Sequence, residues 1–296
     1  MKIRTYDSVT IAVHGFSYIV IGLFALLCLL PFLLVISSSF SSEVIITTEG
    51  FGLLPKGFST AAYDMLFLAP QYLAGSYAVT VIMTVAGTFC GLFIVSMTGY
   101  ALQRKDFPLR NAISFFIYFT TLFSAGLAPS YLWFTKYLGL KNNYLAVFLP
   151  LLMSPWLIIL MKNFVKQIPH EITESGKIDG AGDFLIFRAL ILPMLTPALA
   201  TISLFIALGY WNEWYNSMLY LTNLKYKPLQ YYLYKIVNEA AALRNSLAGQ
   251  NVQIQNIPTL TLKMATAVLV TGPIIFLYPF VQKYFITGIT IGAVKG

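Results

Sequence analysis

The chain has 296 residues, of which 58 % are hydrophobic and only 10 % charged, and its formal net charge is +8. Average soluble proteins are about a quarter charged, so this composition excludes an ordinary soluble globular protein. The basic residues lie mainly between long apolar blocks, as the bias of membrane proteins toward Lys and Arg in cytoplasmic loops predicts. Nucleic-acid binding is therefore not expected.

Six blocks of the sequence contain no Asp, Glu, Lys or Arg, and each is long enough for a transmembrane helix, which needs about 20 apolar residues. The sequence therefore predicts an all-α membrane protein with six transmembrane helices in a single domain, residues 1–296. The expected spans are residues 14–38, 73–102, 111–135, 143–162, 190–219 and 264–283. The longest outer loops are expected at residues 43–64 and 221–262.

The N-terminal block is predicted to be a retained anchor. Lys2 and Arg4 precede an apolar core at residues 16–36, which is longer than the roughly 7 to 15 residues of a signal-peptide core. With six spans, the short loop carrying Arg104, Lys105 and Arg110 favours a cytoplasmic position for both termini. Outside, Pro and Gly predict a compact loop at residues 43–64, and apolar periodicity predicts an amphipathic helix at residues 228–244.

The longest charged interruption, residues 168–193, predicts two short helices before the fifth span. Pro169 suits a first helical position, and acidic residues in the following turns complement the positive end of a helix. Gly176 and Gly180 are four residues apart, so they should form a small-residue face that another backbone can approach. Residues 180–182 should end this helix, and Asp183 should cap a second one. Pro193 and Pro197 should then kink the fifth span.

The pattern of this stretch resembles the "EAA" signature of ABC importer permeases. Glu174 opens the motif, Gly180 follows at the family spacing, and Leu190 and Leu192-Pro193 complete it. Ser175 and Gly176 replace the two alanines of the signature, so small residues are kept. The Asp179-Gly180-Ala181 core, the C-terminal QKYFITGITIGAVKG and the segment GLLPKGFS are similar to the shorter permease of maltose-type sugar importers. PLQYYLYK resembles the sub-branch that handles oligosaccharides and polysaccharide fragments.

This resemblance implies a type I ABC importer permease fold with a cytoplasmic coupling helix, in a bacterial cytoplasmic membrane. The chain would be the non-enzymatic transmembrane subunit of an ATP-driven, binding-protein-dependent sugar importer. Its implied partners are a second homologous permease subunit in a heterodimer, two ATPase subunits, an extracytoplasmic solute-binding protein, the sugar and membrane lipid. ATP and magnesium belong to the ATPase, since this chain has no GxxxxGK[ST] phosphate loop.

The resemblance also implies two contacts with the ATPase. The C-terminal tail would contact it through Gly288, Gly292 and Lys295. The coupling segment would dock on it through ten residues: Glu171, Glu174, Ser175, Gly176, Asp179, Gly180, Ala181, Asp183, Leu192 and Pro193.

One cluster near the outer end of the fifth span suits sugar chemistry, because aromatic faces stack on sugars and amides and carboxylates bind hydroxyls. An aromatic belt at the membrane interface with a solvated Glu213 explains the same residues equally well. Both interpretations stay open for the cluster Tyr210, Trp211, Asn212, Glu213, Trp214, Tyr215 and Asn216.

Other candidate sites are weak. His14 and His170 have no Cys or carboxylate partners at ligand spacing, so no metal site is expected. Gly87 and Gly91 are spaced to let the second span pack closely against a neighbour. An ion-coupled secondary transporter of a small polar solute would need buried carboxylates, and a membrane-embedded enzyme would need a polar catalytic cluster. The apolar cores show neither.

Overall fold

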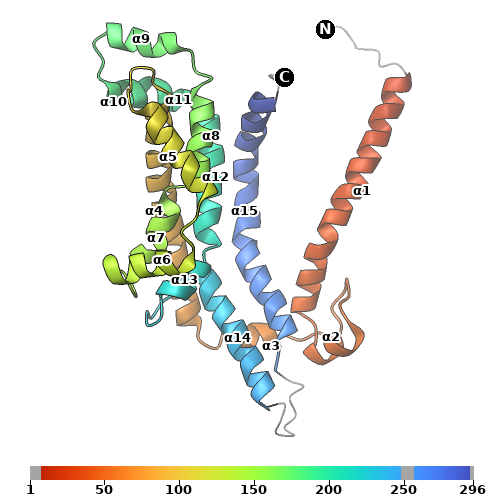
Figure 1. Cartoon of the computed structure of the whole chain (residues 1–296). Coiled ribbons are helices and arrows are strands. Elements are labelled where there is room, and N and C mark those ends of the chain that lie inside the picture. The colour runs from red at the N-terminus through yellow and green to blue at the C-terminus, as the bar shows by residue number, and fades with distance from the viewer. Residues whose placement is uncertain (1–7, 248–256, 294–296) are drawn as a thin grey trace. The chain divides into compact units, whose positions relative to one another are not determined.

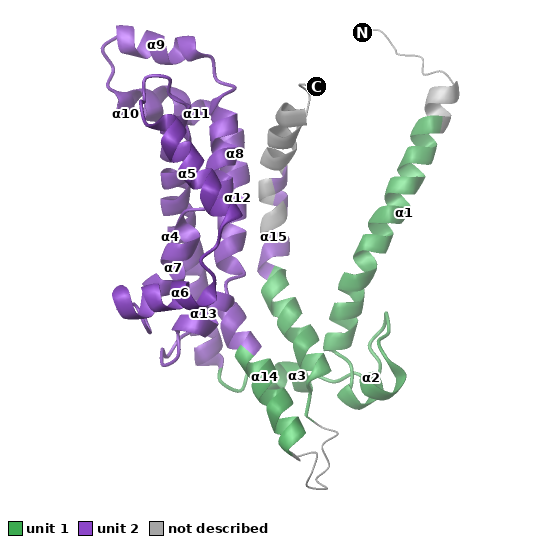
Figure 2. Cartoon of the chain, in the orientation of Figure 1, with its two compact units in different colours: residues 1–69, 235–272 green, residues 70–234, 273–296 purple. Residues whose placement is uncertain are grey.

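The computed structural model describes residues 8–247 and 257–293, and all of its regular structure in these ranges is helical (Figure 1). This confirms the all-α prediction. The contacts divide the chain into two compact units, residues 1–69 with 235–272 and residues 70–234 with 273–296 (Figure 2). Each unit joins stretches that are far apart in the sequence.

The first unit contains α1 (Ser8–Ser39), α2 (Glu43–Glu49) and α3 (Ala61–Leu66). It also holds most of α14 (Leu229–Leu247) and the start of α15 (Leu260–Ala293). The apolar side chains of α1 are largely exposed in the chain by itself, as expected for a helix surrounded by lipid or a partner. After α1, Ser42 N–H donates to the Lys56 carbonyl at 3.0 Å and the Phe40 ring stacks on Tyr63. These contacts close the segment into a compact loop, and its outer position remains a prediction.

A buried carboxylate holds this unit together. Glu43 is 8 % exposed and accepts hydrogen bonds from the Arg244 side chain at 3.1 Å and from Thr259 Oγ1 at 2.8 Å. It also accepts from the backbone N–H groups of Leu260 (3.0 Å) and Thr261 (2.9 Å), at the start of α15. Burial acts to raise the pKa of Glu43, but these hydrogen bonds outweigh it and lower the pKa below its ordinary 4.5.

The second unit is a bundle around α4 (Pro70–Gln103). This helix packs mainly against α12 (Thr196–Trp211) and α8 (Pro155–Val165), with α7 (Leu145–Leu152) and α5 (Arg110–Leu122) beside it. Gly87 lies against the Tyr210 ring and Gly91 against the Leu152 carbonyl, which confirms that this glycine pair is used for close packing. Other buried members of the core include Val95, Val147, Ile158, Met161, Ile186, Ile191 and Ile202.

Within the described residues, three helical stretches are long and apolar enough to cross a membrane: Val13–Ser39, Pro70–Gln103 and Leu145–Val165. The third predicted span, residues 111–135, is a bent pair of helices and not one continuous helix. The helix α5 ends at Leu122, and the chain turns by 116° into α6 (Leu127–Leu132) and a π-helical turn, η1 (Trp133–Tyr137). Phe123 is extended and Gly126 has a φ of +85°, so these two residues end one helix and start the next.

The fifth predicted span is also bent. The arms Asp183–Met194 and Thr196–Tyr220, which include α13 (Tyr215–Tyr220), meet at 87°, so the kink predicted from Pro193 and Pro197 is confirmed. Counting each bent pair as one span gives up to five spans within the described residues. The sixth predicted span falls in α15, whose apolar part is described over Leu260–Phe276. The count of six remains a prediction.

Candidate functional site

The coupling segment begins with α9 (His170–Ile178), which stands at one end of the bundle of the second unit (Figure 1). Pro169 precedes this helix with ψ of 137°, so the helix starts one residue later than predicted. Glu171 lies in the first turn, where its charge favours the helix. Glu174 is exposed, and its carboxylate lies 3.6 Å from His170 Nε2.

The end of α9 is a Schellman motif. Gly180 has a φ of +77°, its N–H donates to the Lys177 carbonyl at 3.0 Å, and Ala181 N–H donates to the Gly176 carbonyl at 2.9 Å. This is the geometry in which a left-handed glycine ends a helix. Asp179 is the C-cap and Gly180 lies beyond the helix, so the predicted small face formed by Gly176 and Gly180 is wrong.

Gly176 faces the helix that follows α9 in the sequence. It is buried, and a Cβ built on it would lie 3.0 Å from Ile186 and 3.1 Å from Leu190. The glycine therefore allows α9 to pack on the helix that follows it. Thr173 is buried on the same side.

The opposite side of α9 is open. Glu171, Glu174, Ser175 and Ile178 are exposed, and their spacing of three, four and seven residues places them on one face. Ile178 is 86 % exposed, although isoleucine is among the residues most often fully buried in proteins. We call these four residues the α9 outer face. Ile178 is not part of the sequence motif, although its spacing from Glu171 and Glu174 places it on the same helical face.

The second helix of the segment runs through α10 (Asp183–Ile186), a π-helical turn η2 (Phe187–Ile191) and α11 (Leu192–Met194). Gly182 is its N-cap and Asp183 its first residue, so Asp183 is not the predicted cap. Leu192 is half-buried and Pro193 exposed. The helix leads through the bend at Leu195 directly into α12, and hence into the fifth span.

Charged side chains connect both helices of the segment to the loop after α4. Arg104 Nε donates to Asp106 at 2.8 Å, and Arg104 also pairs with Asp183. Lys177 Nζ lies 2.6 Å from the same Asp106 carboxylate. Hydrogen bonding to Asp106 raises the pKa of Arg104, while hydrogen bonds from Arg104 and Lys177 hold the pKa of Asp106 well below its ordinary range.

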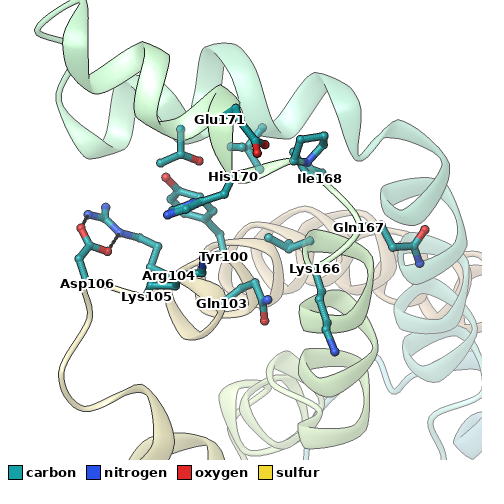
Figure 3. Close-up of a pocket in the computed structure, with 14 residues that line it drawn as sticks. Tyr100, Gln103, Arg104, Lys105, Asp106, Lys166, Gln167, Ile168, His170 and Glu171 are labelled. Carbon is teal, nitrogen blue, oxygen red and sulfur yellow. Dashed lines mark hydrogen bonds and ion pairs between the residues drawn. The ribbon is translucent and has the colours of Figure 1, made fainter.

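A cavity of about 380 Å³ lies between the start of α9 and the end of α4 (Figure 3). Figure 3 shows the Asp106 carboxylate facing the Arg104 guanidinium beside this space. The N-terminal half of α9 therefore does not pack flat on the bundle. The polar residues labelled around the cavity include Gln103, Lys105, Lys166, Gln167, His170 and Glu171.

The predicted sugar cluster at the C-terminal end of α12 divides into two parts. Tyr210 and Trp211 are buried, and the Tyr210 hydroxyl donates to the Phe148 carbonyl at 2.8 Å. Glu213 is 8 % exposed and accepts from the N–H groups of Asn216 (2.6 Å) and Ser217 (3.2 Å) at the start of α13. It also accepts from Asn216 Nδ2 at 3.0 Å. A solvated Glu213 is therefore excluded.

The other part of the cluster is exposed and includes two residues that sequence reasoning missed. Trp214 lies 5.0 Å from the Tyr234 ring, and Gln230 Nε2 donates to Asn212 Oδ1 at 3.2 Å. Tyr234 and Gln230 come from α14, some twenty positions along the chain. Together with Tyr215, these residues present aromatic faces and amides; we call Asn212, Trp214, Tyr215, Gln230 and Tyr234 the outer aromatic patch.

The C-terminal tail is described only in part. Gly288 and Gly292 lie in α15, and Lys295 lies outside the described residues. The predicted contact of this tail with an ATPase remains a prediction.

Comparison with known proteins identifies the family. Residues 85–291 match the family described as binding-protein-dependent transport system inner membrane component. The chain is 38 % identical to the polygalacturonan/rhamnogalacturonan transport system permease protein YtcP of Bacillus subtilis, over all of both chains. It is 28 % identical to the trehalose/maltose permease protein MalG of Thermococcus litoralis, over 93 % of this chain and 94 % of that protein.

A solved structure agrees with these relatives. A bacterial ABC transporter involved in the import of the acidic polysaccharide alginate contains a chain that is 30 % identical to this one. The match has a TM-score of 0.75 and covers 96 % of this chain and all of that one. The protein therefore belongs to the inner-membrane permeases of binding-protein-dependent ABC importers, and it is a transport subunit and not an enzyme.

Proposed function

We propose that this permease imports oligosaccharides derived from an acidic polysaccharide and that an ATPase docks on the α9 outer face to drive it. The observation that carries the docking proposal is the geometry of the coupling segment. The face with Glu171, Glu174, Ser175 and Ile178 is exposed, while the opposite face is packed on the second helix, which continues into α12.

This geometry suits the transmission of motion. An exposed apolar side chain flanked by carboxylates can anchor in a pocket of a partner. Because Gly176 packs closely on Ile186 and Leu190, a displacement of α9 moves the second helix with it. Four other members of the predicted docking set lie at the turn between the two helices: Asp179, Gly180, Ala181 and Asp183. Gly176 faces the second helix, and Leu192 and Pro193 lie near the end of that helix.

The assembly we propose has the usual parts of an importer of this family: a second, homologous permease in a heterodimer, two ATPases and an extracytoplasmic solute-binding protein. Both termini and α9 lie on the cytoplasmic side. ATP and magnesium bind to the ATPase. Alternation between inward-open and outward-open states follows the movement of α9.

The proposal for an acidic sugar rests on the relatives and on local charge. Two of the relatives handle polygalacturonan or alginate, both of which are acidic. In the segment between α13 and α14, Lys225 Nζ lies 5.1 Å from the Tyr226 ring and Lys227 Nζ 5.5 Å from the Tyr231 ring. Cations held beside aromatic faces suit a sugar that carries carboxylates.

The outer aromatic patch is our candidate for the sugar path. Trp214 and Tyr234 are 38 % and 42 % exposed, so their rings are available to stack on sugar faces. The amides of Asn212 and Gln230 lie within the same patch and can bind hydroxyl groups. The buried members of the predicted cluster, Tyr210, Trp211 and Glu213, are not part of this surface.

Transport by the whole importer, reconstituted in proteoliposomes with its binding protein, tests the function. We expect uptake of oligogalacturonate that requires ATP, and loss of ATPase co-purification with Glu174→Lys or Ile178→Asp. Asn223→Ala, an exposed outer residue, is the matched control and should retain both. Uptake driven by a proton or sodium gradient without an ATPase would overturn the proposal.

A further inference from the structure

Four charged side chains form a continuous chain of ion pairs at the cytoplasmic end of α4. Asp183 of α10 pairs with Arg104 of the following loop, Arg104 pairs with Asp106, and Asp106 pairs with Lys177 of α9. The two carboxylates alternate with the two cations. Arg104 and Asp106 are joined through two guanidinium nitrogens and two carboxylate oxygens. Figure 3 shows this bidentate pair of Arg104 and Asp106.

Single exposed ion pairs contribute little, but networks built on a bidentate arginine are the exception. The Arg104 side chain is only 16 % exposed. Its guanidinium lies 5.9 Å above the Tyr100 ring, and Tyr100 in turn packs on Phe187 of η2 at 5.5 Å. The arginine is therefore held by an aromatic ring as well as by two carboxylates.

The network bridges both sides of the turn at Gly180. Lys177 comes before the turn and Asp183 after it, and both reach the same short loop after α4. The turn itself is closed by the backbone hydrogen bonds of Gly180 and Ala181, and Gly176 packs on the second helix. The ion pairs add a second link between the two helices, through the loop after α4, and so reinforce the angle between them.

We propose that Arg104 is a positioning residue for transport: it reinforces the angle between α9 and α10 and joins both to α4. A displacement of α9 then passes into α4 as well as into α12. This inference rests on the proposed docking of the ATPase on α9. Since α4 and α12 also pack along each other through Gly87 and Tyr210, the two helices then move as one body.

The test compares Arg104→Ala with Lys105→Ala in the complete importer in proteoliposomes. Lys105 is the exposed neighbour in the same loop, so its replacement removes the same charge without breaking the network. The measured quantity is the amount of oligogalacturonate taken up per ATP hydrolysed. We expect Arg104→Ala to lower this ratio by roughly 2- to 30-fold, the range of coupling effects along connecting networks, with the ATPase still bound. Lys105→Ala should leave it unchanged.

A double variant separates a specific pairing from a general loss of folding. Arg104→Ala combined with Asp183→Asn should lower the ratio no further than Arg104→Ala alone, because variants within one network of contacts are not additive. An unchanged ratio in Arg104→Ala overturns the proposal. Losses that add in the double variant also overturn it, and so does a failure of Arg104→Ala to assemble with the ATPase. If Glu174→Lys leaves ATPase binding intact, the docking proposal fails instead, whatever Arg104 does.

Discussion

The Tyr210 ring of α12 lies directly against Gly87 of α4. A Cβ atom built on Gly87 would come within 2.2 Å of a ring carbon, and the Tyr210 hydroxyl is fixed by its bond to the Phe148 carbonyl at 2.8 Å. The ring cannot move aside without breaking that bond. The two central helices therefore touch at a point that only glycine allows.

Gly87→Ala should destabilise the permease by about 1–3 kcal/mol, the usual cost of overpacking a filled core. Thermal unfolding in detergent measures this. Gly209→Ala, in the same helix as Tyr210, is the control, because nothing lies within 4 Å of its Cβ position. It should be neutral or slightly stabilising, since Ala favours a helix more than Gly. Equal melting temperatures for the two variants would contradict the close contact.

Gly176→Leu should lower the melting temperature of the permease even when no ATPase is present. The added side chain would displace Ile186 and Leu190, whose atoms lie at 3.0 and 3.1 Å from the Cβ position, at a cost of about 1–3 kcal/mol. Gly182→Ala, with free space around it, is the control. If Gly176→Leu leaves the isolated permease as stable as before but abolishes ATPase binding, Gly176 faces outward and our description of α9 is wrong.

Glu43→Gln should destabilise the first unit, residues 1–69 with 235–272, by about 1–3 kcal/mol, since it weakens several hydrogen bonds to a buried group. Glu49→Gln, which removes an exposed carboxylate next to Lys56, should change little. Because the pKa of Glu43 is lower in the folded protein than its ordinary 4.5, its contribution is fully present above that value and is lost as pH falls through the folded pKa. The difference in melting temperature between wild type and Glu43→Gln should therefore be constant near neutral pH and shrink in acid.

Replacing the buried Glu213 and the exposed Trp214 should have different effects. Glu213→Ala leaves the N–H groups of Asn216 and Ser217 without their acceptor and should cost about 1–3 kcal/mol of stability without changing the concentration of sugar that gives half-maximal uptake. Trp214→Ala should leave stability nearly unchanged and raise that concentration, because an exposed stacking surface is lost. Uptake kinetics and thermal unfolding measured on both variants decide this. A sugar effect confined to Glu213→Ala would contradict the proposed patch.

Much of the fold could be predicted from the sequence because the membrane imposes long apolar helices. The first and second spans, the compact loop after the first span and the kink near Pro193 follow from uninterrupted apolar blocks and from proline geometry. The break in the third span does not. Phe123 continues an apolar run, and only Gly126 with Pro129 behind it indicated the turn.

The coupling segment was predicted in position but not in orientation. A sequence motif shows that Gly176 is needed, yet it cannot tell whether the free space receives a partner or a neighbouring helix; here Ile186 and Leu190 fill it. The ion pair of Arg104 with Asp183 joins residues about eighty positions apart, and sequence spacing carries no information on such contacts. Ile178 could have been found, because it lies seven residues after Glu171 on the same helical face.

Cross-linking from α9 tests the central claim most directly. A single cysteine replaces Ile178 in a permease whose Cys28 and Cys90 are changed to alanine, and it is labelled with a benzophenone maleimide in the assembled importer. Thr173→Cys, on the buried side of the same helix, is the matched control. We predict that light links the label at position 178 to the ATPase and that the label at position 173 gives little or no product. No link from position 178, or an equal link from both, would contradict the docking of the ATPase on the α9 outer face.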